Sequence, residues 1–219
     1  MVYHIYTGLI IDKVNENTDC PLCAIKKVVE EEFLYEFLND AVMDDDVRTK
    51  VNKLGFCSEH FDKLLDRKNK LSVALQISTR LNTIINDIKS PNFKHQTKKL
   101  EEAESTCVIC DLVKESMEKY YKTFAYMFLT DKNFAKSISK SKGFCLEHYK
   151  ELLKYSSHAG AMKKEYLKVL QEIELNNLYA LQSDLKTFCD KHDYRNRNMP
   201  LGSAEKALPK ARTKLYGEK

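Results

Sequence analysis

The 219-residue sequence contains no tryptophan, only six glycines and only four prolines. So few turn-forming residues disfavour a β protein with many short strands, and they favour long helices. Apolar residues make up 43% of the chain and charged residues 31%, which is enough of both for amphipathic helices around a hydrophobic core. The composition therefore predicts an all-α fold.

Long hydrophobic runs are also missing. No apolar segment approaches the roughly 18 to 20 residues that a membrane-spanning helix needs. The first ten residues, MVYHIYTGLI, have neither the basic leader nor the small-residue cleavage site of a secretory signal. We therefore expect a cytoplasmic protein, in which clustered cysteines are more often metal ligands or redox thiols than disulfides.

The sequence also lacks common catalytic motifs and, in residues 1–189, any net charge, and both absences limit the possible functions. The chain has no G-x-S-x-G, P-loop or G-x-G-x-x-G motif, which disfavours an enzyme without deciding the question. The net charge of +4 comes entirely from residues 190–219, which carry eight basic and four acidic residues, while residues 1–189 carry 28 of each. Nucleic-acid binding is therefore not expected of the body of the protein, and only a weak contact through the basic tail remains open.

Cysteines and histidines recur at a fixed interval. The stretch GFCSEH at 55–60 returns as GFCLEH at 143–148, and CPLC at 20–23 is matched by CVIC at 107–110. The offsets of the four cysteine and histidine pairs are 87, 87, 88 and 88 residues. We interpret this as a tandem repeat of two helical units. Each C-x-x-C should open a long amphipathic helix, and each C-x-x-H should lie in the first turn of a later helix.

The recurring residues are suited to binding a tetrahedral metal ion. Positions i and i+3 of a helical turn lie on one face, so each pair can supply two ligands, and three thiolates with one imidazole suit Zn²⁺. The 33 and 34 residues between the pairs are enough for a helix out and a helix back. We therefore predict two structural zinc ions per chain, with an iron-sulfur cluster as the less favoured alternative. The predicted ligand sets are Cys20, Cys23, Cys57 and His60, and separately Cys107, Cys110, Cys145 and His148.

A third half-motif, Cys189 and His192, has no further C-x-x-C to complete it. It could form an exchangeable or inter-subunit metal site, but an ordinary packed cysteine and a surface histidine are the favoured interpretation.

The predicted organisation has four parts. An extended N-terminal segment of strand-like composition spans 1–19, and it could lie over the body or pair across a homodimer. The first metal-clamped repeat spans 20–90 and the second spans 91–188, with Pro91 at the boundary. The basic C-terminal tail spans 189–219 and should contain a short helix near residues 203–215.

Several of these stretches together resemble uncharacterised bacterial proteins grouped as domain of unknown function 6062, over nearly the whole chain. The stretches are YHIYTGLI, CPLC, DDDVRTKVNKLGFCSEH, ISTRL, CVIC, GFCLEHY, DYRN and ALPKA. The resemblance implies no activity, but it marks the same eight cysteines and histidines. It also suggests that the tail docks back on the helical body, with Arg195 pairing an acidic residue there.

We therefore expect a non-enzymatic, zinc-stabilised helical protein that acts as a protein-interaction module. The alternative is a redox or metal-handling protein, in which the same eight ligands hold iron-sulfur clusters or exchangeable metal.

Overall fold

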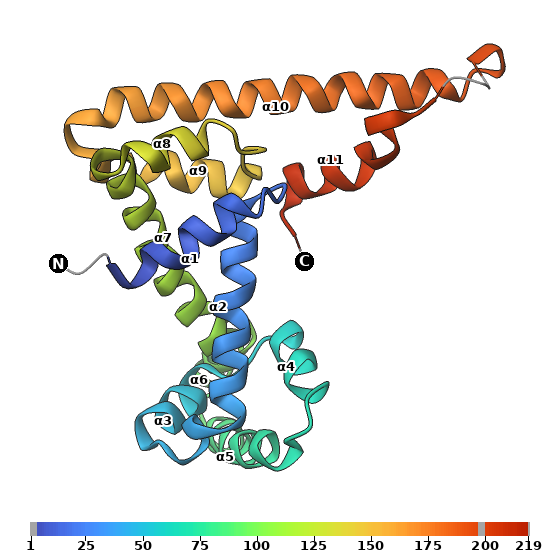
Figure 1. Ribbon diagram of the computed structural model, residues 1–219. Helices are drawn as coiled ribbons and strands as arrows, with labels where there is room; N and C mark the ends of the chain where they lie inside the picture. Colours follow the sequence, from blue (N-terminus) through green and yellow to red (C-terminus); the bar gives the residue numbers. More distant parts are fainter. Residues whose placement is uncertain (1–3, 197–199, 219) are drawn as a thin grey trace. The chain divides into compact units, whose positions relative to one another are not determined.

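The computed structural model describes residues 4–196 and 200–218 (Figure 1). Among them the regular elements are helices, with no strand, so the predicted all-α fold is confirmed. Residues 1–3 of the predicted N-terminal segment, and Arg197 and Lys219 of the predicted basic tail, lie outside the described residues. With η marking 3₁₀ helices, the elements are α1 (His4–Asn15), α2 (Pro21–Leu38), η1 (Asp40–Met43), α3 (Asp45–Leu54), α4 (Ser58–Leu65), α5 (Lys70–Ile88), α6 (Phe93–Ser105), α7 (Val108–Thr130), α8 (Lys132–Ile138), α9 (Leu146–Lys154), η2 (Ser156–Met162), α10 (Lys163–Lys191), η3 (Tyr194–Asn196), η4 (Gly202–Lys206) and α11 (Ala207–Tyr216).

The helices follow each C-x-x-C in the same order. A long helix, α2 or α7, is followed by a shorter helix, α3 or α8, then by a helix that begins at a C-x-x-H, and then by a longer helix. Both shorter helices are capped in the same way. The Asp44 carboxylate accepts hydrogen bonds from the first backbone N–H groups of α3, and the Asp131 carboxylate does so for α8. This order matches the predicted one, while an origin by duplication stays a prediction.

The expected extended N-terminal segment is wrong for the described residues, because residues 4–15 form helix α1. Ile10 and Val14, four residues apart, are both buried, and the Tyr6 ring meets the Tyr120 ring edge to face at 4.9 Å. A single strand would have left its backbone groups without partners in a helical protein, whereas a helix satisfies them internally. The β propensity of this segment was therefore overridden by hydrogen bonding and burial.

The chain divides into two compact units. The larger unit takes its residues from 1–26 and 117–219, and the smaller unit is 27–116. Both boundaries between the units fall inside long helices, α2 and α7. Neither unit therefore coincides with one of the predicted segments, 20–90 and 91–188. In the larger unit α1 packs on α8, and in the smaller unit α6 packs on α3 and α5.

An aromatic residue precedes each cysteine of the C-x-x-H pairs and ties it to the core of its unit. In the larger unit Phe144 is fully buried and meets Phe124 edge to face at 5.7 Å. In the smaller unit Phe56 meets Phe37 in the same way at 5.6 Å. Such pairs stabilise a fold because they bury apolar surface and because the edge of one ring contacts the face of the other. Core packing therefore fixes the position of the cysteine that follows.

No described helix is long and apolar enough to cross a membrane.

The glycines that precede these Phe-Cys pairs have left-handed backbone conformations, with φ +66° at Gly55 and +76° at Gly143. A Cβ at Gly143 would lie 2.8 Å from Glu174 Oε2 and 3.2 Å from Lys214 Nζ. Only glycine meets both the dihedral and the space requirement at this turn.

We predict that Gly143→Ala lowers the free energy of unfolding by about 1–3 kcal/mol, because it combines backbone strain with a clash against buried charged groups. The matched control is Gly8→Ala in α1, where a Cβ meets nothing within 4 Å. That change should be neutral or stabilising by up to about 1 kcal/mol. Chemical denaturation measures both, and equal effects of the two changes would contradict the assignment.

Candidate metal centres

Each of the four sequence pairs lies at the start of a helix. Cys20 and Cys107 directly precede α2 and α7, while Cys57 and Cys145 are the N-cap residues of α4 and α9. The second member of each pair is the third residue of its helix, so one helical turn places both side chains on the same side. Helix N-termini carry a partial positive charge that favours thiolates. The prediction that these residues lie in first helical turns is confirmed.

The first cluster, called here the Cys20 cluster, lies within the larger unit and consists of Cys20, Cys23, Cys145 and His148. His148 Nδ1 is 3.4 Å from Cys20 Sγ, 3.3 Å from Cys23 Sγ and 3.1 Å from Cys145 Sγ. The Sγ atoms of Cys23 and Cys145 are 3.7 Å apart. All four residues are buried.

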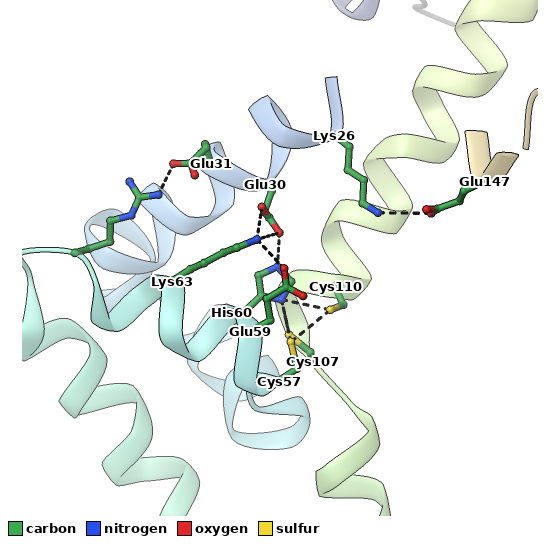
Figure 2. Close-up of polar contacts among 11 residues, drawn as sticks. Lys26, Glu30, Glu31, Cys57, Glu59, His60, Lys63, Cys107, Cys110 and Glu147 are labelled. Atoms are coloured by element: carbon green, nitrogen blue, oxygen red, sulfur yellow. Dashed lines mark hydrogen bonds and ion pairs between the residues drawn. The ribbon is translucent and has the colours of Figure 1, made fainter. Parts of the chain in front are cut away.

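The second cluster, called here the Cys57 cluster, lies within the smaller unit and consists of Cys57, His60, Cys107 and Cys110 (Figure 2). His60 Nδ1 is 3.2 Å from Cys57 Sγ, 3.4 Å from Cys107 Sγ and 3.3 Å from Cys110 Sγ. The Sγ atoms of Cys57 and Cys110 are 3.8 Å apart. Cys107 and His60 are buried, Cys57 is half-buried and Cys110 is exposed.

The predicted division of the eight residues into two sets is therefore wrong. We expected each C-x-x-C to meet the C-x-x-H that follows it, as Cys20, Cys23, Cys57 and His60 and as Cys107, Cys110, Cys145 and His148. Instead, CPLC meets the second C-x-x-H, and CVIC meets the first.

Helix length explains the exchange. The 18 residues of α2 span about 27 Å, whereas the ten residues of the returning helix α3 span about 15 Å. In the other half the 23 residues of α7 span about 34 Å and the seven of α8 about 10 Å. Because each returning helix is shorter than the outward one, the returning helix alone does not bring the C-x-x-H back to the start of its own long helix. The C-x-x-H meets the other C-x-x-C instead.

The donor atoms of both clusters fit one tetrahedral ion. With Zn–S bonds of about 2.3 Å, the edge between two sulfur ligands of a tetrahedron is about 3.8 Å, and an S–N edge is slightly shorter. The S–S distances of 3.7 and 3.8 Å match that edge, and they are far longer than a disulfide bond. In both clusters Nδ1 is the nitrogen that faces the sulfurs, so the Nε2 atoms are left to carry the ring proton.

The titration behaviour of the Cys20 cluster reflects its burial. Burial raises the pKa of Cys20, and the Cys145 and Cys23 thiols raise it further. Hydrogen bonds from Cys20, Cys23 and His148 lower the pKa of Cys145 well below its ordinary value. Burial lowers the pKa of His148, but hydrogen bonds and charge interactions with Cys145 and Cys23 outweigh it and raise the pKa to about 9. A bound cation would replace that proton as the charge partner of the thiolates.

The two histidines differ in their outer partners. His60 Nε2 lies 2.9 Å from Glu30 Oε1, and the Glu30 carboxylate also binds Lys63 Nζ at 2.8 Å, as Figure 2 shows. A carboxylate behind a histidine fixes its tautomer and its orientation toward a metal. In the part of the chain that the structure describes, the buried Nε2 of His148 has no hydrogen-bond partner, and its ring lies 6.0 Å from that of Tyr121.

The C-terminal helix docks beside the Cys20 cluster, as the family resemblance suggested. In Figure 1, α11 returns from the far end of α10 toward the start of α2. The Lys214 ammonium is buried and donates hydrogen bonds to the carbonyls of Asp19 at 2.9 Å, Phe144 at 3.2 Å and Lys142. These residues lie just before Cys20 and beside Cys145, so one side chain connects the two ligand-bearing helix starts.

Gly217 and Glu218, which follow α11, also cover the sulfurs. The Glu218 backbone N–H donates to Cys23 Sγ at 3.4 Å. A Cβ at Gly217 would lie 3.6 Å from Cys23 Sγ and 3.8 Å from Cys145 Sγ. The expected pairing of Arg195 with an acid of the body is wrong, because Arg195 binds Asp193, two residues away.

The smaller unit connects its ligand-bearing helices differently. Thr106 Oγ1 donates to the Leu54 carbonyl at 2.7 Å, and the Val108 N–H donates to the Gly55 carbonyl at 3.0 Å. Arg80 of α5 donates to the carbonyls of Asn52 and Lys53, at 2.5 and 3.0 Å. In the larger unit Asp19 stands 87 positions before Thr106, and the Lys142 carbonyl corresponds to that of Leu54. The Asp19 carboxylate cannot donate a hydrogen bond to this carbonyl, and the Lys214 ammonium donates one instead.

Sequence reasoning missed these supporting residues: Glu30, Lys63, Arg80, Glu174 and Lys214. Buried Glu174 accepts a hydrogen bond from the Phe144 N–H at 2.9 Å, and burial raises its pKa. Arg80 and Lys214 lie within or near stretches that carried the family resemblance, which was the one available signal. Of the interpretation favoured for the third half-motif, the surface position of His192 is confirmed, and its Nδ1 bonds the Phe188 carbonyl. The expected packing of Cys189 is wrong, because Cys189 is exposed.

The fold and the clusters define a class, an all-helical protein with two clusters of three cysteines and one histidine that could hold metal ions. The chain belongs to a family described as "Family of unknown function (DUF6062)", which matches residues 1–219. It is also similar to an "Uncharacterized 23.9 kDa protein in xynA 3'region" of Caldicellulosiruptor sp. (strain Rt8B.4). The two are 26% identical over 184 residues, which cover 81% of this chain and 84% of that protein. No solved structure matches.

We predict that Lys214→Met lowers the free energy of unfolding by about 2–3 kcal/mol, because buried carbonyls beside the cluster lose their donor. Lys210→Met on the same helix is the control, since the ion pair of Lys210 within the described residues is a 3.8 Å contact with Asp184. It should cost at most about 1 kcal/mol. Denaturation curves of the two variants that coincide would show that Lys214 does not connect the helix starts.

Proposed function

We propose that the protein is a non-enzymatic helical scaffold stabilised by two zinc ions, one in each cluster. The observation that carries the proposal is the meeting of two helix N-termini at each group of four donors, whose atoms lie within 4.8 Å of one another. Four protein ligands complete a tetrahedron and leave no open position for a substrate or water, as in structural sites. All seven cysteines are free, which is consistent with the reducing cytoplasm where we place the protein.

The donor spacing favours a single ion over an iron-sulfur cluster. In a cluster, additional irons and sulfides lie between the protein cysteines and hold them further apart than the edge of one tetrahedron. Three thiolates and one imidazole are ligands that suit zinc, which has no redox chemistry and accepts tetrahedral geometry without distortion. Such an ion leaves about one negative charge on its ligands, and buried Lys214 lies beside one of the centres to offset it.

A role in protein interaction is supported by the surface of α5. Large apolar side chains there are 46% to 69% exposed, at spacings that keep them near one side of the helix: Leu71, Leu75, Leu81, Ile85 and Ile88, at 69%, 50%, 50%, 46% and 51%. Exposed apolar groups of this extent are typical of protein-binding surfaces. Sedimentation of the purified chain distinguishes a second copy from a different protein as the occupant.

Redox or metal-handling activity is the second candidate, and the exposure of Cys110 favours it. A thiolate in contact with solvent can react with oxidants or exchange its metal, whereas a buried one cannot.

The deciding experiment is elemental analysis, with a visible spectrum, of protein purified anaerobically without added metal. We expect two zinc ions per chain and no colour. Iron with sulfide and visible absorbance would replace the zinc scaffold with the redox alternative, and protein free of metal that binds none when titrated would reject both.

The exchanged ligand sets can be tested by cadmium substitution. Cadmium NMR of the wild-type protein should give two signals. We predict that Cys20→Ser and Cys145→Ser perturb the same signal, although these residues are 125 positions apart. Cys57→Ser and Cys110→Ser should perturb the other signal. If Cys20→Ser and Cys57→Ser affect one signal together, the ligand sets are those of the sequence prediction, and the exchange is wrong.

The carboxylate behind His60 gives a prediction specific to one centre. Glu30→Gln should weaken zinc binding to the Cys57 cluster about 10- to 100-fold, because His60 loses its charged partner. Glu31→Gln is the control, since Glu31 pairs with Arg67 outside the cluster. Competition with a chelating indicator measures both affinities. Loss of affinity at the Cys20 cluster, or equal effects of the two variants, would reject the role of Glu30.

A further inference from the structure

The two clusters contain the same ligand types but differ in their access to solvent. In the Cys20 cluster the exposed fractions are 0% for Cys20, 5% for Cys23, 0% for Cys145 and 1% for His148. The Glu218 N–H and the backbone at Gly217 cover the Cys23 and Cys145 sulfurs, and Lys214 holds this segment in place. An external reagent reaches these sulfurs only after α11 and the residues that follow it move away.

The Cys57 cluster has an open side. Cys110 is exposed and Cys57 is half-buried, while Cys107 and His60 are buried at 4% and 5% exposure. Within residues 4–196 and 200–218, the hydrogen-bonding contacts of Cys110 Sγ are with Cys57, His60 and Cys107 of its own cluster. The described helix α6 of the same unit packs on α3 and α5. One cysteine of this centre is therefore exposed and a second is partly so, while Cys107 and His60 are enclosed.

We propose that Cys110 is the site at which a low-molecular-weight disulfide reacts with the protein, releasing the ion of the Cys57 cluster while the Cys20 cluster keeps its ion. This inference rests on the proposed zinc occupancy. It makes the smaller unit responsive to the thiol–disulfide balance and leaves the larger unit unresponsive.

The reaction is a pair of thiol–disulfide exchanges. Cys110 Sγ, held as a thiolate in the metal-bound state, attacks one sulfur of R–S–S–R and expels R–S⁻. Cys57 Sγ, 3.8 Å away, then attacks the Cys110 sulfur of the mixed disulfide and expels the second R–S⁻. The two protein thiolates lose two electrons and the reagent gains two. The ion loses two of its four donors and is released as Zn²⁺ with its charge unchanged.

The exposed Cys189 would also react with the reagent, so the test uses a Cys189→Ser background. The full-length zinc-loaded protein is mixed with excess dithiodipyridine in the presence of a chromogenic zinc indicator. We expect two phases of one zinc each, the first at least about tenfold faster, because the second requires local opening of the C-terminal segment. Peptide mapping after the fast phase should find a disulfide between Cys57 and Cys110.

Two histidine substitutions assign the fast phase, since histidine keeps a metal ligand and removes the thiol. Cys110→His should abolish the fast phase while two zinc ions remain bound. Cys23→His, at the equivalent position 87 residues earlier, should leave the fast phase intact. A fast phase that persists in Cys110→His, or that disappears in Cys23→His, overturns the proposal, as does release of both ions at one rate.

Brief alkylation provides an independent measurement if Cys110→His binds only one zinc ion. In zinc-loaded Cys189→Ser protein, N-ethylmaleimide should label Cys110 before any other cysteine, as read by peptide mass spectrometry. Uniform labelling, or earlier labelling of the Cys20 cluster, overturns the proposal. Protein that binds no zinc before the reagent is added refutes the proposed function itself, whereas two tightly held ions with a single release rate refute only this inference.

Discussion

The mismatch in length between the outward and returning helices is the constraint on which the arrangement of the clusters depends. Helices α2 and α7 carry two cysteines at their first turn, and α3 and α8 are each shorter than the helix before them and do not return the next C-x-x-H to that point. Each C-x-x-C is therefore completed by the C-x-x-H from the other half of the chain. The compact units follow from this exchange, because each unit takes in the donors of one cluster and the helices that hold them.

The two clusters contain the same types of donor, three cysteines and one histidine, but different residues surround them. The smaller unit joins its two ligand-bearing helix starts through Thr106 and Val108, while Arg80 of α5 binds carbonyls that precede Cys57. The larger unit has Asp19 where Thr106 stands in the other half, and it obtains the missing donor from Lys214 of the C-terminal helix. Supplying that donor brings Gly217 and Glu218 over the sulfurs. The segment that carries Lys214 thus also closes the Cys20 cluster, while the Cys57 cluster stays open at Cys110.

These surroundings suggest a division of roles between otherwise similar centres. A buried centre with a charge-compensating lysine is suited to holding helices together. A centre with one exposed sulfur and a histidine oriented by Glu30 is also enclosed enough to bind tightly, but it offers a point of chemical attack. The scaffold role and the responsive role that we propose are therefore compatible in one chain, with the larger unit proposed for the first and the smaller unit for the second.

The sequence by itself determined the helical fold, the order of the helices, and the eight residues that come together, because these depend on local signals: few breakers, capping aspartates at 44 and 131, and cysteine or histidine at i and i+3. It could not decide which pairs meet, since linker length in residues bounds a distance but not the direction of a rigid helix. Helix α1 also went against local propensity, because burial of Ile10 and Val14 outweighed it. Only the tertiary structure placed Lys214 and Glu30 beside the clusters and left Cys110 exposed, because these depend on contacts between residues far apart in the chain.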